Sequence, residues 1–359
     1  MNVLIVSLNP NVAHVSHLIA YYLQFKEFGY SPVLYIHKNL IQYIPKGFNY
    51  LEYNKFKICK VKANVALFYS PTFGNLFEIV KFKLRYKIKI MFVKHEPFDK
   101  MVLIDNTSSY WKRLWYVLAN LYECVITYIS DVIILPSNKA IALYEKGWLY
   151  FNRHYFYLPL QFDDESNYDN SIVERKYFSF IGSIGYVTNN HSFDSFLNFV
   201  ETAIQKESLK EFNFLIATKN TINIDDRLQK MITTGRLLII AGKPLTNESI
   251  NFYYKSSLVV WNAYARNTQS GVLAKSFMFG TPTIVLCRNI SEFVKDGDEI
   301  VAINDNNSYN EIADALQKIL ANYEHFSNAA RKCFLENFYY RRNNETMNNI
   351  VEKLVKNKK

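Results

Sequence analysis

A polar turn followed by a short helical pattern offers the clearest chemistry in this sequence. The turn 266–271 reads RNTQSG and comes after the apolar run 258–261. Beyond it, apolar and small residues recur with helical spacing, and Gly280 and Pro282 mark the end of the helix. The N–H groups of a first helical turn carry about half a positive charge. The turn therefore predicts a binding site for a diphosphate.

The candidate residues for binding the diphosphate-bearing molecule, called the donor below, lie in this turn and in the helix after it. Arg266 would supply a fixed cation, and Ser270 would cap the helix. The candidates are Arg266, Asn267, Thr268, Gln269, Ser270, Gly271, Val272 and Lys275. An ordinary helix with a Ser N-cap explains the same spacing, so the pattern alone leaves both interpretations open.

A second group of reactive residues follows the apolar run 87–94, in the sequence KHEPFD. A His titrates near neutrality, and a neighbouring carboxylate can accept a proton from a hydroxyl group. His95 is therefore the first candidate for a catalytic base, Glu96 the second and Asp99 the third. If either acid is the base, a reaction that inverts the configuration of the attacked carbon atom is favoured. The alternative is that His95 only ties this loop to the next element.

Strands must position these residues, and the sequence provides two series of them. The first half has apolar runs at 3–8, 31–37, 65–69, 87–94, 132–136 and 156–161. The second half has them at 177–181, 212–217, 237–241, 258–261 and 283–286. Helical patterns such as 15–28 and 109–130 separate many of these runs. Alternating strands and helices predict an α/β protein with two doubly wound parallel sheets.

We predict a first Rossmann-like domain over residues 1–165 and a second over 175–340. The acidic, Asn-rich piece 162–174 has the composition of a linker, and 341–359 is a last, basic helix. Lys219 and Lys243 follow the second and third strands of the second half, at the edge where such sheets bind ligands. Each could bind a phosphate or a nucleotide base. The alternative is that each is an ordinary solvated lysine in a loop.

The stretch TQSGVLAKSFMFGTPTIV resembles the sugar-nucleotide signature of the family 4-like, or group 1, glycosyltransferases of the B clan. The segments YFSFIGSIG at 177–185 and ISEFVKDGDEI at 290–300 resemble flanking parts of the same family. The resemblance implies the glycosyltransferase B fold, two Rossmann-like domains facing across a cleft. It adds Gly182 and Ser183 to the donor-binding candidates, and its first loop implies an acceptor site. The acceptor candidates there are Asn11, His14 and His17.

The sequence departs from the family at the positions of its paired glutamates. These would fall at Asn267 and Lys275, so neither carboxylate is present, and Ser183 stands where a basic residue is expected. We interpret the chain as a divergent branch in which Arg266 or Lys275 takes over charge compensation. Whether transfer retains or inverts the anomeric centre stays open.

Neither a metal nor a cofactor is expected. The four cysteines, Cys59, Cys124, Cys287 and Cys333, are scattered without the spacing of a zinc site or a disulfide framework. The single Asp-x-Asp, at 296–298, has no strand ending just before it and is interpreted as a turn. The helix N-terminus and Arg266 would supply positive charge in place of a metal.

The formal net charge of +10 is concentrated in the first half. Between Lys55 and Lys100, eleven Lys or Arg residues accompany three acidic ones and are interleaved with Phe and Tyr. Such a segment favours an anionic membrane surface, and a solvated face is the alternative. Nucleic acid is disfavoured because no recognised binding motif accompanies the charge. No secretory signal or spanning segment is expected, so we place the chain in the cytoplasm, peripheral on the membrane.

These observations predict a glycosyltransferase of hexosyltransferase type. It would move a sugar from a nucleotide-diphosphate donor to a glycan or lipid-linked acceptor in cell-surface polysaccharide synthesis, such as that of lipopolysaccharide. Two alternatives remain: a non-catalytic subunit that binds a nucleotide sugar or glycan, which the missing glutamates favour, and a sugar-nucleotide epimerase.

Overall fold

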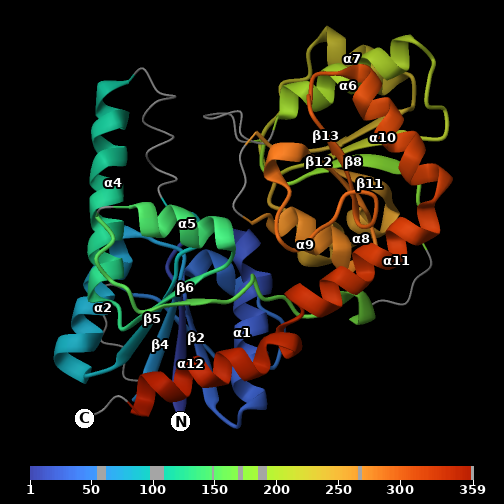
Figure 1. The fold of residues 1–359 in the computed structure, drawn as a ribbon. Helices are drawn as coiled ribbons and strands as arrows, with labels where there is room; N and C mark the ends of the chain where they lie inside the picture. The colour runs from blue at the N-terminus through green and yellow to red at the C-terminus, as the bar shows by residue number, and fades with distance from the viewer. Residues whose placement is uncertain are drawn as a thin grey trace. The chain divides into compact units, whose positions relative to one another are not determined.

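The computed structural model describes residues 1–54, 62–97, 109–147, 149–168, 173–184, 192–265 and 269–356. The chain divides into two compact units. The first is formed by Met1–Asp163 together with Phe338–Lys359, and the second by Asp164–Asn337. Each unit is built on one parallel sheet (Figure 1).

The first unit has a seven-stranded sheet in the order β3-β2-β1-β4-β5-β6-β7. Its strands are β1 (Asn2–Ser7), β2 (Ser31–Ile36), β3 (Tyr50–Glu52), β4 (Val65–Tyr69), β5 (Lys89–Val93), β6 (Val132–Leu135) and β7 (Tyr155–Tyr157). All neighbours pair in parallel. The order reverses between β1 and β4, and this reversal is the switch point where open α/β sheets bind ligands.

Helices cover both faces of this sheet because consecutive residues of its central strands are apolar and point to opposite faces. Val3 and Ile5 of β1 pack on the side of α1 and α12, whereas Leu4 and Val6 pack on the side of α2, α4 and α5. The helices are α1 (Val15–Glu27), α2 (Phe73–Tyr86), α4 (Tyr110–Ile129), α5 (Asn138–Lys146) and α12 (Asn344–Lys356). The short helical turns are η1 (Val12–His14), η2 (Lys38–Tyr43) and η6 (Tyr340–Asn343). The C-terminal helix α12 thus completes the core of the first unit.

The second unit repeats this plan with six parallel strands in the order β10-β9-β8-β11-β12-β13. They are β8 (Tyr177–Ile181), β9 (Asn213–Ala217), β10 (Leu237–Ile240), β11 (Ser257–Asn262), β12 (Thr283–Leu286) and β13 (Ile300–Ile303). Here the order reverses between β8 and β11. The switch point of this unit therefore lies between the turn after β8 and the turn after β11, which carry most of the donor-binding candidates.

The helices of the second unit are α6 (Phe193–Gln205), α7 (Asp226–Thr233), α8 (Asn247–Ser256), α9 (Gly271–Met278), α10 (Tyr309–Ala321) and α11 (Tyr323–Cys333). The remaining turns are η3 (Glu165–Tyr168), η4 (Cys287–Asn289) and the π-helical turn η5 (Phe334–Phe338). The core centres on Trp261, whose ring lies 6.1 Å from that of Phe178 and 5.8 Å from that of Phe196. Among the described residues, no helix is both long and apolar enough to cross a membrane.

The predicted strands 65–69, 177–181 and 283–286 are confirmed at both ends. The predicted strand 156–161 is wrong beyond Tyr157. The N–H of Leu158 still donates to the Leu135 carbonyl, but the next residue is Pro159, which has no N–H to continue the ladder. Strand β13 was not predicted, because its four residues follow a segment that reads as a loop.

The prediction of a polar linker over 162–174 is also wrong for its first residues. Asp164 and Glu165 are buried rather than solvated. Arg331 donates to both carboxylate oxygens of Asp164. Burial raises the pKa of Asp164, but the hydrogen bonds from Arg331 and Ser166 and the charge of Arg331 together outweigh this effect and hold the pKa below its usual value. Asp164 and Glu165 are therefore part of the second unit.

Gly280 follows the end of helix α9 in a left-handed conformation with little space around it. Its φ is +63°, and an added Cβ would lie 3.0 Å from Oγ and 3.2 Å from the carbonyl oxygen of Ser327. Gly29 has a similar φ of +74°, with nothing within 4 Å of the same point. Gly29→Ala should lower the free energy of unfolding by about 1–2 kcal/mol, the cost of a left-handed residue. Gly280→Ala should lower it by roughly a further 1–3 kcal/mol, because of overpacking.

Chemical denaturation of the two variants measures this difference. Equal losses for Gly29→Ala and Gly280→Ala would show that α11 moves aside to accommodate the methyl group.

Candidate functional site

The N-terminus of α9 is organised by Ser270, as the sequence predicted. The Ser270 hydroxyl accepts a hydrogen bond from the N–H of Leu273 at 3.2 Å and donates one to Oδ1 of Asn262 at 2.9 Å. The N–H groups of Gly271 and Val272 have no hydrogen-bond partner among the described residues. Both residues are partly accessible to solvent. Two donors of the first helical turn are therefore available to an anion.

The turn after β8 lies directly beside this helix start. Gly182 has a φ of +132°, and a Cβ placed on it would lie 3.4 Å from Cγ2 of Val272. Strands β8 and β11 are neighbours at the switch point. The structure thus brings together Gly182, Ser270, Gly271 and Val272, which the sequence had proposed as donor-binding residues. A Cβ at position 182 would contact the first turn of α9, and the φ of +132° favours glycine there.

Asn220, which sequence reasoning missed, holds three turns of this edge together. Its Oδ1 accepts hydrogen bonds from Oγ of Ser183 at 3.2 Å, from the N–H of Ile184 at 3.0 Å and from Oγ1 of Thr218 at 3.2 Å. Its carbonyl accepts the N–H of Gly242 at 3.0 Å. The turns after β8, β9 and β10 are therefore fixed relative to one another. The only signal in the sequence was an Asn soon after a strand.

Asn262, at the end of β11, is a second residue that the site candidates did not include. Its side chain is buried, and its Nδ2 group has no hydrogen-bond partner among the described residues. A buried donor without a partner costs about 1–3 kcal/mol. Since Oδ1 of the same side chain accepts from the helix cap Ser270, this donor lies close to the start of α9.

The remaining donor-binding candidates have different positions. Lys219 and Lys243 are exposed and follow β9 and β10, which lie one and two strands from β8 on the side away from the switch point. Gln269 is buried immediately before the helix cap. Arg266, Asn267 and Thr268 lie outside the described residues, and so does the acid Asp99. The roles of all these residues in binding stay predictions.

Lys275 is buried and pairs with a carboxylate of the same unit. Its role in binding a ligand stays a prediction. The sequence suggested that its charge compensates a ligand, but its Nζ lies 2.7 Å from Oε2 of Glu165, and each of the two side chains is only 7% exposed. Asn251 donates to the same carboxylate oxygen at 2.8 Å. Glu165 therefore already neutralises the Lys275 ammonium. Sequence spacing could not show this pairing, because the two residues are far apart in the chain.

The acceptor-binding candidates lie near the switch point of the first unit. Asn11 caps η1 by accepting the N–H of Ala13, and its Nδ2 lies 3.5 Å from Nε2 of His14. The ring of His14 packs edge-on against Tyr69, with 5.1 Å between the ring centres. These two residues remain partly accessible.

His17 is buried and serves the core of the first unit. Its Nδ1 lies 2.9 Å from the carbonyl oxygen of Gln161, and its ring stacks on Tyr69 and packs against Phe162. Each of these contacts restricts the ring. Contact of His17 with an acceptor stays a prediction, although the surroundings suit a structural His.

The catalytic candidates His95 and Glu96 follow β5 and are partly buried. The residue before them, Lys94, is completely buried and forms an ion pair with Glu123 of α4. The N–H of Lys94 also donates to the Ile134 carbonyl of β6 at 2.9 Å. These two contacts hold Lys94 in place, directly before the loop that carries His95.

A metal site is not apparent in the residues described. Among them, no group of three or more His, Cys, Asp or Glu side chains could hold an ion. In the Asp296–Asp298 turn, Gly297 has a φ of +89°. Asp298 lies 2.8 Å from Nζ of Lys295 and 3.3 Å from Nε2 of His325. The Asp298 carboxylate of this turn therefore pairs with side chains close to the turn.

Similar folds are found among known structures. A sucrose-phosphate synthase from Thermosynechococcus elongatus is 11% identical, with 99% of each chain covered and a TM-score of 0.64. A glycosyltransferase from Rickettsia africae ESF-5 is 12% identical, with 99% of each chain covered and a TM-score of 0.66. HepE of Anabaena, in complex with UDP, is 9% identical over 98% of this chain and 100% of its own, with a TM-score of 0.68.

These likenesses confirm the predicted fold, the glycosyltransferase B fold with two Rossmann-like parts. Residues 175–322 match the family described as glycosyl transferases group 1. Over these residues, which lie in the second unit, the chain is similar to the group 1 glycosyltransferases. Lys275, which stands at the place of a family glutamate, agrees with a divergent branch. No curated protein sequence matches the chain.

The buried pair of Lys275 and Glu165 gives a test of stability. Lys275→Met or Glu165→Leu should each lower the free energy of unfolding by about 3–5 kcal/mol, because the other charge stays buried without its opposite charge. The matched control is the exchange Lys275→Glu with Glu165→Lys, which keeps both charges and should lose less than either single variant. Urea denaturation measures all three. A single variant as stable as the parent protein would show that solvent reaches the remaining charge.

Proposed function

We propose that this protein transfers a hexose from a nucleotide-diphosphate donor to a glycan or lipid-linked acceptor. The observation that carries the proposal is the start of α9, where the N–H groups of Gly271 and Val272 lie beside Gly182 at the switch point. A diphosphate fits such a site because it brings negative charge to unpaired donors. The UDP named in the HepE complex supports a nucleoside diphosphate as the leaving group.

In the proposed reaction, the bond between the anomeric carbon and the diphosphate oxygen breaks, and the diphosphate leaves with the electron pair. The acceptor hydroxyl oxygen forms the new bond to the anomeric carbon, and its proton passes to a base. The donors of α9 would stabilise the charge that develops on the leaving diphosphate, without a metal. His95 is the proposed base or the group that orients the reacting sugar, with Glu96 as second candidate. Retention or inversion stays open.

A second candidate function is that of a non-catalytic subunit which binds a nucleotide sugar or glycan. It is favoured by one observation: Lys275 occupies the place of a family glutamate and is already paired with Glu165. The two functions differ in turnover alone. Donor binding without sugar transfer or hydrolysis, with a membrane extract as acceptor, would favour the binding subunit.

We further propose that the protein works in cell-surface polysaccharide synthesis, in the cytoplasm and peripherally at the inner face of the membrane. The basic segment between Lys55 and Lys100 motivates this location. Part of its charge is compensated, since Lys81 pairs with Glu78, and Lys83 and Lys89 lie 3.1 and 3.9 Å from Asp131. The exposed cations Arg85 and Lys87 remain available to lipid head groups.

Gly271→Pro tests the helix start directly. Proline suits the first position of a helix but has no N–H. The preceding residue, Ser270, already has φ −94° and ψ 119°, an extended conformation that precedes proline without strain. The variant should therefore fold and weaken nucleoside diphosphate binding by about 1.5–3 kcal/mol, the value of a hydrogen bond to a charged group. Calorimetric titration with UDP, GDP and ADP measures it.

The control for this experiment is Gly271→Ala, which keeps the N–H and meets nothing within 4 Å. It should bind like the parent protein. If Gly271→Pro binds the same diphosphate as tightly as Gly271→Ala, the start of α9 is not the phosphate site.

His95→Ala should reduce turnover by about 100-fold or more while donor affinity stays near that of the parent, if His95 accepts the proton or orients the sugar. Donor screening by mass spectrometry with membrane extract as acceptor supplies the substrate for this assay. Thermal unfolding of the variant serves as the control. Equal losses of stability and activity would assign His95 a structural role only.

A further inference from the structure

The longest helix of the first unit, α4, exposes a row of large apolar side chains. Trp111 is 76% exposed and Trp115 is 59% exposed. The exposed row consists of Tyr110, Trp111, Leu114, Trp115, Val117, Leu118, Leu121, Val125 and Tyr128. Their spacing of three or four residues places most of them on one side of the helix. Soluble monomers rarely expose a continuous apolar surface of this kind unless it binds something.

The buried side of α4 is more polar than the exposed side. Asn120, Glu123 and Thr127 are buried there, alongside Ala119, Cys124 and Ile126. A surface helix of a globular protein normally buries its apolar face and exposes its polar one. In α4 this arrangement is inverted. The exposed apolar side chains of α4 therefore do not belong to the core of the first unit. An apolar phase outside the protein would bury them.

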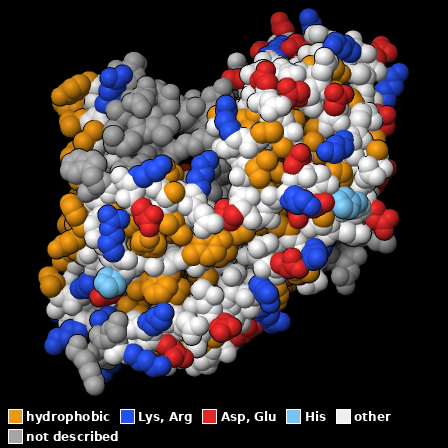
Figure 2. Space-filling model, viewed as in Figure 1, with side chains coloured by type: hydrophobic (Ala, Val, Ile, Leu, Met, Phe, Trp, Pro, Cys, Tyr) orange, Lys and Arg blue, Asp and Glu red, His pale blue; other side chains and the backbone are white. Residues whose placement is uncertain are grey.

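The exposed row continues onto α2, the neighbouring helix. Phe73, Phe77, Val80 and Leu84 lie at i, i+4, i+7 and i+11 and are all exposed, Leu84 to 79%. The ring of Phe73 lies 5.8 Å from that of Tyr122 on α4, so the two rows are contiguous. Figure 2 shows hydrophobic side chains along the left edge of the view, where Figure 1 places α4. We call this combined surface the α4–α2 face.

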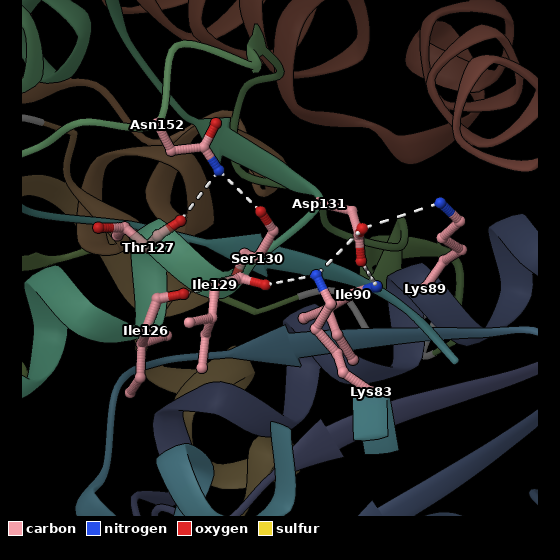
Figure 3. Close-up of polar contacts among 9 residues, drawn as sticks. All are labelled: Lys83, Lys89, Ile90, Ile126, Thr127, Ile129, Ser130, Asp131 and Asn152. Atoms are coloured by element: carbon pink, nitrogen blue, oxygen red, sulfur yellow. Dashed lines mark hydrogen bonds and ion pairs between the residues drawn. The ribbon is translucent and has the colours of Figure 1, made fainter. Parts of the chain in front are cut away.

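Polar contacts hold the C-terminal end of α4 in place (Figure 3). Asn152 donates through Nδ2 to the carbonyls of Thr127 and Ser130, at 2.9 and 2.7 Å. Lys83 donates to the carbonyl of Ile129 at 2.7 Å, and Asp131 accepts the N–H of Ile90 from β5 at 2.8 Å. These side chains satisfy carbonyls that the last helical turn leaves without a partner. The apolar row is therefore presented on a fixed helix.

We propose that the α4–α2 face inserts into the interfacial layer of a lipid bilayer. Trp and Tyr, with amphipathic rings, favour that layer, and four residues of the α4 row are of these types. Exposed cations accompany the face: Lys112 and Arg113 on α4, and Arg85 and Lys87 at the end of α2. They complement anionic head groups. Attachment thus depends mainly on apolar side chains, and the basic residues assist it.

A second copy of the chain fits this surface less well. Two-helix association requires a narrow apolar seam flanked by charged residues. Here the flanks of the seam are themselves apolar, with Tyr110, Trp115 and Val117 beside Leu114 and Leu118. A two-fold contact with the two α4 helices parallel would also bring Lys112 and Arg113 close to their own copies, and like charges repel. A bilayer provides a broad apolar phase and opposite charge together.

The test is binding of the full chain to vesicles of phosphatidylcholine with and without phosphatidylglycerol. The test variant combines Trp111→Gln, Trp115→Gln and Leu118→Gln, all on exposed positions. The matched control is Phe252→Gln with Leu238→Gln, two exposed residues of the second unit. The parent should bind anionic vesicles and keep much of that binding between about 0.1 M and about 1 M salt, although the screening length falls from about 10 Å to about 3 Å.

The test variant should bind roughly tenfold or more weakly at both salt concentrations, because affinity scales with inserted apolar area. The control should bind like the parent. Arg85→Gln with Lys87→Gln should weaken binding at low salt only. Two of the four tryptophans lie on α4, so a blue shift of tryptophan emission on adding vesicles reports insertion of this face.

Two outcomes would overturn the proposal. Equal vesicle binding by the parent and the test variant would show that the α4–α2 face does not touch lipid. A parent protein that ignores vesicles but dimerises in sedimentation, with the dimer lost in the test variant, would identify a second copy as the occupant. Because these vesicles contain neither donor nor acceptor, the result does not depend on sugar transfer.

Discussion

Two opposite charges lie in the interior of the first unit, on Lys94 at the end of β5 and on Glu123 in the middle of α4, with 2% of each side chain exposed. Placing either charge there alone costs several kcal/mol, so each side chain can be buried only with the other. Burial lowers the pKa of Lys94, but the charge and hydrogen bond of Glu123, with contributions from Tyr150 and Cys124, together outweigh burial and raise the pKa above its usual value. The helix is thereby fixed to the strand that leads into the candidate catalytic loop.

The orientation of α4 follows from this pair. Because Glu123 must face Lys94, the residues on its side of the helix, Asn120 and Thr127, also turn inward. The opposite side, with its Trp and Leu residues, is left to solvent. Lys94 of this pair directly precedes His95. The contact between Lys94 and Glu123 therefore positions both the loop with the proposed base and the apolar face of α4. A disturbance of α4 can therefore reach the loop through a single buried contact.

Local signals in the sequence predicted the parts of the structure that depend on near neighbours. Ser270 was recognised as a helix cap because a cap needs only a residue type and an N–H three positions later. Runs of β-branched residues located most strands, and their alternation with helices fixed the fold class. Helix α2 was missed because lysines interrupt its apolar residues, which made the segment look like a charged patch.

Contacts across long separations could not be predicted in this way. Nothing near Asn220 in the sequence shows that its side chain meets Ser183 and Ile184, because the strand order brings those turns together. Glu165 was assigned to a linker, and Lys275 to a ligand, since spacing alone gives no indication that they pair. Residues 266–268 and 98–108 lie outside the described parts of the chain, so the sequence remains the source for Arg266 and Asp99.

The pairing of Lys275 with Glu165 also constrains how this protein can change over generations. A carboxylate at position 275 opposite Glu165 would bury two like charges, and a neutral residue there would leave the Glu165 carboxylate buried without the Lys275 charge. Neither position can therefore be exchanged without its partner. A lineage that replaced one member of the pair would have to acquire the other almost at once, or lose the folded second unit in between.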